Sequence, residues 1–108
     1  MNTFKNAGSA ITSTGTVLYT CPSATGNVAI IHALYISNID GTSPANASIE
    51  ITIDGGTTYI HIGKTLIVPE DSTLVFDKPI NLEAGDKLKI TASSNSTLEA
   101  ACSILLIT

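Results

Sequence analysis

The feature that most constrains the fold of this chain is a succession of short β-prone segments, separated by turn signals at roughly ten-residue spacing. The segments are rich in Ile, Val and Thr, whose branched side chains favour strands. The turn signals, such as NIDGTSPAN, EAGD and SSNS, contain the Gly, Pro, Asn and Asp residues of tight turns. No segment of about ten residues or more carries uninterrupted apolar positions at helical spacing. The pattern predicts about eight strands, near residues 16–21, 28–37, 47–54, 58–63, 73–76, 80–82, 87–92 and 98–107.

A chain of 108 residues has room for a single hydrophobic core. Hydrophobic residues make up 44% of it but aromatic residues only 5%, so the core must be aliphatic. Short strands joined by short turns predict an all-β fold, an antiparallel β-sandwich of jelly-roll-like type, over residues 16–108. Residues 1–15 are rich in Ser, Thr, Asn, Gly and Ala, and their few larger apolar side chains lack periodicity. We therefore expect them to form a flexible amino-terminal arm.

The stretch SIEITIDGGTTYIHI, residues 48–62, is the clearest hairpin in the sequence. Polar and apolar residues alternate in it, and Gly55-Gly56 supplies the two positive-φ positions of a tight turn. This register directs Ile49, Ile51 and Ile53 to the core and pairs the outward residues across the two strands. The outward residues form a candidate contact patch: Glu50, Thr52, Tyr59 and His61. We expect the patch to be a solvated face, because it contains a single aromatic residue.

Two predicted strands are apolar on both faces, VAIIHALYI at residues 28–36 and AACSILLI at residues 100–107. Each strand of a two-layer sandwich normally has one wet face, so another surface must cover the second apolar face. The chain has no helix to spare, which makes a second subunit the preferred cover. The alternative is that the small alanines tolerate exposure while the arm covers the remainder. The expected interface residues are Ile31, Ala33, Tyr35, Leu105 and Ile107.

Charge and hydropathy argue against two classes of partner. The formal net charge is -4, and the five basic residues are dispersed lysines without a single arginine, so we expect no direct binding of nucleic acid. No stretch approaches the roughly 20 apolar residues of a membrane span. The amino terminus also lacks the apolar run of a secretory signal, so we expect neither membrane insertion nor export by that route.

No residue pattern predicts catalysis, a metal site or a cofactor. His61 facing Glu50 has no third ligand, which favours a structural cross-strand pair. His32 lies among apolar neighbours, and we expect a hydrogen-bonded histidine of the core or of an interface. Cys21 and Cys102 lack a motif-placed base; two buried thiols are expected, with a disulfide as the alternative. The sequence therefore predicts a protein that is not an enzyme.

Four stretches follow one another along the chain: TVLYTCPSATGNVAIIHALYISN, SIEITIDGGTTYIHI, IVPEDSTLVFDKPINLEAGDKLKITAS and the closing CSILLIT. Their succession resembles a group of small virion structural proteins of tailed bacteriophages. The resemblance covers about Thr16 to Thr108 and is a pattern of strands and turns. The chain departs from it chiefly at Phe76-Asp77-Lys78-Pro79, where a shorter turn is usual.

The resemblance implies an assembly role in the virion. The leading expectation is a capsid decoration, or cement, protein that binds and stabilises the head shell as a homotrimer. Its partners would be further copies of itself and the major capsid protein or another virion protein. The alternatives are a β-domain of the tail, collar, baseplate or fibre, or a carbohydrate-binding module on a fibre. The scarcity of aromatic residues for stacking on sugars counts against the last of these.

Overall fold

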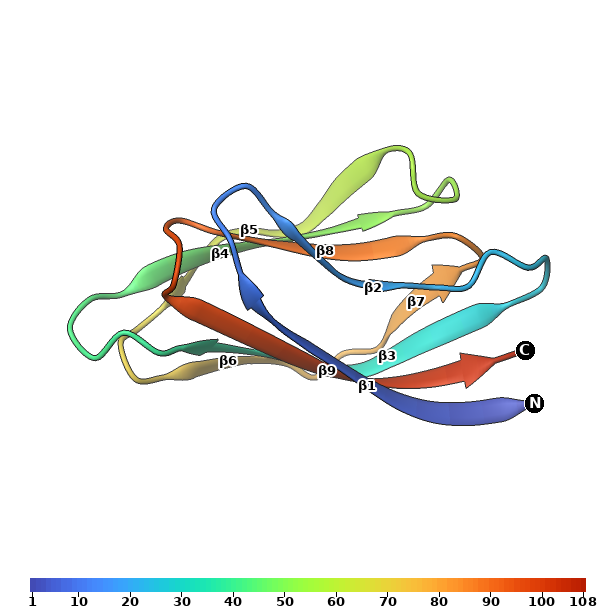
Figure 1. Cartoon of the computed structure of the whole chain (residues 1–108), viewed down its shortest axis with the longest axis horizontal. Helices are drawn as coiled ribbons and strands as arrows, with labels where there is room; N and C mark the ends of the chain where they lie inside the picture. The colour runs from blue at the N-terminus through green and yellow to red at the C-terminus, as the bar shows by residue number, and fades with distance from the viewer.

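The alternating segments of the sequence form nine strands, and the chain contains no helix (Figure 1). A computed structural model describes residues 1–108. The strands are β1 (Asn2–Ile11), β2 (Thr16–Thr20), β3 (Val28–Asn38), β4 (Ala45–Thr52), β5 (Tyr59–Val68), β6 (Thr73–Phe76), β7 (Ile80–Glu83), β8 (Lys87–Ala92) and β9 (Leu98–Ile107). No helix is available that could cross a membrane.

The strands lie in two antiparallel sheets that face each other (Figure 1). One sheet has the order β1-β9-β3-β6, with β7 also paired to β3, and the other has the order β2-β8-β4-β5. This arrangement confirms the predicted all-β, antiparallel sandwich of jelly-roll type. Strands β1 and β9 run side by side, so the two ends of the chain meet at one end of the sandwich (Figure 1).

The core is aliphatic, as the composition predicts. It contains 21 buried apolar residues contributed by both sheets. The largest fully buried aliphatic side chains are Ile11, Ile31, Leu34, Ile36, Ile49, Val68, Leu82, Leu88, Ile90, Leu98 and Ile104. Burial of each such side chain contributes about 1.5–3 kcal/mol to the hydrophobic driving force. No aromatic residue lies among the buried core residues.

Residues 1–15 contain a strand that the sequence did not predict. Strand β1, Asn2–Ile11, pairs with β9 at ten consecutive positions. Backbone hydrogen bonding to β9 forms this strand, while its side chains remain outside the core except for buried Ile11 and half-buried Ala7. A strand with so few core contacts shows no hydrophobic period, which is why its sequence resembles a loose arm. Its mobility in the free protein stays a prediction.

A β-bulge in β3 changes the expected sidedness of that strand. Ile31 pairs with Ile104 of β9 and Ala33 pairs with Ser103, which leaves His32 as an extra residue. His32 and Ala33 therefore both lie outside the core, and Leu34 returns to it. The expected placement of Ile31 on the outer surface is wrong, because this side chain is 0% exposed in the core.

The hairpin of β4 and β5 follows the predicted register near its turn. Glu50 pairs with His61 and Thr52 with Tyr59. Beyond Glu50 a bulge pairs Ile49 with Gly63 rather than with Ile62, and β5 continues to Val68 instead of ending at residue 63.

The inner and outer faces of this hairpin also differ from the prediction. Ile53 is 61% exposed rather than in the core, whereas Thr52 is fully buried rather than on the outer face. Burial is possible because the Thr52 hydroxyl accepts a hydrogen bond from the Lys87 N–H at 2.9 Å and donates one to the Asp86 carboxylate at 3.4 Å.

Candidate assembly surface

The sheet that contains β1, β9 and β3 turns one face away from the core, and we call it the outer face. Residues directly opposite each other in an antiparallel pair share a face of the sheet. The register places three large apolar residues in one row across the strands, Phe4, Leu105 and Ile30. A second row, four residues further along, contains Gly8, Ala101, Tyr35 and Val75.

The remaining rows complete the outer face. The middle row is Asn6, Ser103 and Ala33, and the two end rows are Asn2, Ile107, Val28 and Glu83, and Ala10, Glu99, Ser37 and Thr73. None of these side chains is buried. Asn81 of β7 stands in the row of Ile30, and His32 projects beside Ala33 in the middle row. The outer face therefore has large apolar residues in two interior rows, polar side chains in the middle row, and charged side chains only in its end rows.

Large apolar side chains are openly exposed on this face. Phe4 is 78% exposed, Val75 50% and Tyr35 42%. The imidazole of His32, which projects at the β3 bulge, stacks on the Phe4 ring with centroids 6.2 Å apart and an interplanar angle of 26°. Scattered exposed apolar residues are ordinary, but residues gathered on one sheet face are typical of an interaction surface.

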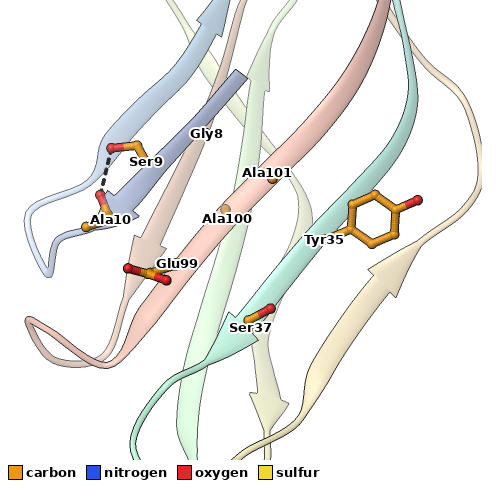
Figure 2. A pocket seen from close by; sticks show the side chains of 8 residues that line it. All are labelled: Gly8, Ser9, Ala10, Tyr35, Ser37, Glu99, Ala100 and Ala101. Atoms are coloured by element: carbon orange, nitrogen blue, oxygen red, sulfur yellow. Dashed lines mark hydrogen bonds between the residues drawn. The ribbon is translucent and has the colours of Figure 1, made fainter. Parts of the chain in front are cut away.

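A hollow of about 440 Å³ lies at the small-residue end of the outer face (Figure 2). Gly8 and Ala10 of β1 and Ala101 of β9 leave little side-chain volume there. Figure 2 shows the Tyr35 ring on one side of the hollow and the Glu99 carboxylate on the other. The outer face thus combines protruding large side chains with a shallow depression.

Four of the five expected interface residues lie on the outer face: Ala33, Tyr35, Leu105 and Ile107. The fifth, Ile31, lies in the core. The sequence alone did not indicate Phe4, Ile30 or Val75 as members of this face. Residues 1–15 carry no hydrophobic period that would have placed Phe4 in a strand.

The expected patch on the β4–β5 hairpin is smaller than predicted, because buried Thr52 is not part of it. His61 Nε2 lies 3.9 Å from Glu50 Oε2, and the Lys89 ammonium lies 4.5 Å above the Tyr59 ring centroid. Each polar group of the patch therefore has a partner on a neighbouring strand: Glu50 with His61, and Lys89 with Tyr59. The expected pairing of Glu50 with His61 is present, and the patch has the composition of a solvated sheet face.

The histidine and cysteine residues are placed as follows. His32 is exposed on the outer face and is not a core histidine. Both thiols are free and buried. Burial raises the pKa of Cys102 to about 11. The pKa of Cys21 is also raised, mainly by burial and to a smaller extent by the negative charge of Asp86. No group of three or more His, Cys, Asp or Glu side chains is arranged to hold a metal ion.

A second, smaller hollow of about 320 Å³ opens at one side of the sandwich. Ile51 and Ile62 of the hairpin and Phe76, Pro79 and Ile80 of the β6–β7 region line it, together with Lys78 and Asn81. It brings together no cluster of titratable groups, so its chemistry favours an apolar contact over catalysis.

The sequence matches no protein-family model and no curated protein. Among solved structures, the chain is similar to a subunit of Bacillus endospore appendages, described as disulfide-linked pili, with 16% identity and a TM-score of 0.61. The alignment covers 100% of this chain and 87% of the appendage chain.

Two bacteriophage proteins are also similar. A pentameric capsid protein from metagenomic phage sequences has 23% identity and a TM-score of 0.51, with 91% of this chain and 60% of that chain covered. A capsid protein of a Helicobacter pylori bacteriophage has 12% identity and a TM-score of 0.54, with 99% and 87% covered. This chain therefore spans slightly less than two thirds of the pentameric protein and most of the other two. At these identities the likeness establishes the fold, and that fold is the β-sandwich of viral capsid and pilus subunits.

Proposed function

We propose that this chain is a non-enzymatic structural protein of a virus particle, most specifically a decoration protein that binds the head shell and stabilises it as an oligomer. The observation that carries the proposal is the outer face, where large apolar residues of three strands remain uncovered in a sandwich whose core is already complete. Apolar surface of this kind is stabilised when a protein partner removes it from water.

The fold and the charge distribution support the same role. The sandwich is shared with capsid subunits, including one described as pentameric. The central rows of the outer face carry no charged side chain, which suits burial against protein better than contact with nucleic acid. The expected partners are further copies of the chain, with a trimer as the sequence-based expectation, and the major capsid protein or another virion protein.

A filament subunit is the second candidate, because the appendage subunit matches this chain over its whole length. That appendage is described as disulfide-linked, whereas both thiols here are buried, Cys21 at 0% and Cys102 at 2% exposure. Buried thiols cannot link neighbouring subunits without opening the core. A β-domain of the tail, collar, baseplate or fibre would bind its partners through the same kind of apolar surface. Only its location in the particle distinguishes it from a decoration protein of the head. A sugar-binding role finds less support, since the outer face has no Trp and exposes only Phe4 and Tyr35 as aromatic rings.

The experiment that tests the proposal locates the chain. Particles purified from the source culture are labelled with gold-conjugated antibody raised against the recombinant chain and viewed by electron microscopy. Label over the head shell supports decoration. Label confined to the tail supports the alternative position in the virion, and filaments formed by the purified chain alone support the second candidate.

A variant pair connects the location to the outer face. We expect Phe4→Asp to abolish binding of the purified chain to particles that lack it, because a carboxylate would be buried in an apolar contact. Ile67→Asp is the matched control, since Ile67 is 67% exposed on β5 of the other sheet. Equal binding by both variants and the wild type would contradict an outer-face attachment.

A further inference from the structure

On strands β1 and β9 the outer face has one row of large residues and one row of small residues, whereas the small row continues into Tyr35 on β3 and Val75 on β6. Phe4 and Leu105 lie in one row, on β1 and β9, and Gly8 and Ala101 lie in another row on the same two strands. Between the two rows lies the middle row, which contains Asn6 and Ser103. The hollow shown in Figure 2 lies at the small row.

The large row and the small row are evenly spaced about the middle row. On β1, Phe4 and Gly8 each lie two residues from Asn6, and on β9, Leu105 and Ala101 each lie two residues from Ser103. A two-fold axis along the middle row would reverse the strand direction and exchange the large row for the small row. A pattern of this kind is self-complementary, which is what a two-fold contact requires.

We infer that two copies of this chain pack outer face to outer face around a two-fold axis along the row of Asn6, Ser103 and Ala33. Phe4 of each copy then lies over Gly8 of the other, and Leu105 lies over Ala101. Each hollow receives the protruding ring of the other copy. Facing sheets pack about 10 Å apart with interdigitated side chains, so the large residues of β1 and β9 fill the space over the small ones. The two His32 rings lie near the axis, where they face each other.

The third strand differs from β1 and β9, because both of its facing residues are large. Ile30 of β3 stands in the row of Leu105, and Tyr35 stands in the row of Ala101. The axis therefore places Ile30 over the Tyr35 ring of the other copy, an aliphatic-on-aromatic contact. The bulge at His32 makes this possible, because it returns Tyr35 to the same face as Ile30.

The area of the contact matches that of a stable dimer. Ten residues at about 3.4 Å per residue and four strands at about 4.8 Å give a face of roughly 34 Å by 19 Å. Two such faces remove about 1,300 Å² from water, which lies within the range of about 1,200–2,000 Å² for specific interfaces. The charged residues of the face, Glu83 and Glu99, lie in its end rows, so the charges stand at the rim while the centre combines apolar residues with the uncharged Asn6 and Ser103.

This inference rests on the proposed function and assigns the outer face to a second copy. The dimer then contacts the head shell through its other surfaces, and Phe4→Asp prevents binding to particles by preventing dimerisation. A shell protein would have to bring its own complementary surface, whereas the large and small rows of β1 and β9 are already complementary to each other. The two-fold contact predicts a particle of twice 11.2 kDa in solution, rather than the trimer expected from the sequence.

The test exchanges the large and small residues of one contact. Residues 101 and 105 are four apart on one strand, about 13 Å, and they meet only between copies in the proposed dimer. We expect Ala101→Leu and Leu105→Ala each to raise the dimer dissociation constant at least tenfold. The double variant places leucine over alanine again, and we expect its dissociation constant to return to within threefold of the wild type. Sedimentation equilibrium over a micromolar concentration series measures all four proteins.

Controls separate assembly from folding. The melting temperature of each variant is measured at a protein concentration below its dimer dissociation constant, so that it reports on the folding of the monomer. Should Leu105→Ala unfold, Ala101→Leu and Phe4→Asp still test the contact, because both positions are exposed. Ile67→Asp should leave dimerisation unchanged.

Three results would overturn the inference. The wild-type protein could be a monomer at high micromolar concentration, or it could be a trimer. The third result is a double variant whose dimer dissociation constant is raised by as much as the effects of the two single substitutions multiplied together. Each of them leaves the proposed function standing if Phe4→Asp still abolishes particle binding. A wild-type dimer whose chain does not label particles would instead overturn the proposed function and leave the two-fold contact intact.

Discussion

Asp86 and Gly55, 31 residues apart, are joined by a hydrogen bond of 2.9 Å from the Gly55 N–H to the Asp86 carboxylate. The other carboxylate oxygen accepts the Glu83 N–H at 3.0 Å. The Thr52 hydroxyl also donates to this carboxylate, and Asp86 is only 3% exposed. One side chain therefore ties the β4–β5 turn to the β7–β8 turn.

We predict that Asp86→Ala lowers the free energy of unfolding by about 2–4 kcal/mol, because it leaves buried donors without an acceptor. Asp86→Asn should lose less, since one carbonyl oxygen remains to accept. Urea unfolding followed by circular dichroism measures both changes. Asp77→Ala, at an exposed turn position, is the control, and an equal loss in that variant would contradict the role of Asp86.

Stability should fall at alkaline pH because of Cys102. Burial raises the pKa of this thiol from 9.0 in the unfolded chain to about 11 in the folded protein. The unfolded chain therefore releases the proton first, so the free energy of unfolding is highest below pH 9 and decreases as the pH rises from about 9 to about 11. Urea titrations at pH 8, 9, 10 and 11 measure the slope. Cys102→Ala should show a shallower decrease, and an identical slope in that variant would assign the effect to other groups.

Changes to the hairpin patch should barely affect folding. Glu50→Ala combined with His61→Ala removes a cross-strand pair that contributes only about 0.2–1 kcal/mol. We expect a change in unfolding free energy within that range and unchanged binding to particles. Thermal denaturation and particle cosedimentation check the two expectations. Loss of particle binding at unchanged stability would assign this surface to assembly and would refute the solvated-face interpretation.

Strand β1 should be the least protected long strand of the free protein. It lies at the edge of its sheet, and Ile11 is its only fully buried side chain, so it can open without disrupting the core. We expect amide hydrogens of residues 2–10 to exchange much faster than those of β3 in a dilute sample, and to gain protection as the protein assembles. Hydrogen exchange with mass spectrometry measures both. Equal protection of β1 and β3 in the monomer would contradict this prediction.

Shortening a side chain to alanine should affect stability differently at the two ends of β1. Ile11→Ala should lower the free energy of unfolding by about 2–4 kcal/mol, because it leaves a cavity in the core. Phe4→Ala should change it by less than about 1 kcal/mol, since that ring is largely exposed. A larger effect of Phe4→Ala on the melting of the monomer would show that the outer face supports the fold itself.

Local chemistry made much of the fold predictable from the sequence. Strands at residues 73–76, 87–92 and 98–107 lie where the prediction placed them, because each is bounded by strong turn residues. The pairing of Glu50 with His61 follows from the Gly55-Gly56 turn, whose residues both have positive φ. In these segments short-range sequence determines both the element and its register.

The candidate surface was less predictable, because three of its determinants are not local. β1 depends on the backbone of β9 for its pairing, and its own side chains give no signal. A period of two places Ile31 on the outer face, because the sequence carries no local signal for the bulge at His32 that reverses the alternation. Thr52 was assigned outward because its partners, Asp86 and Lys87, come from a distant turn.

The bulge in β3 means that this strand contains one residue more than its pairing with β9 requires. Because Ile31 and Ala33 pair with adjacent residues of β9, His32 is one residue more than the ladder uses. A chain without it would run through β3 as an unbroken strand with Ile31, Leu34 and Ile36 still turned inward. His32 is thus dispensable to the interior, and what it adds is a ring on the outer face, stacked on Phe4.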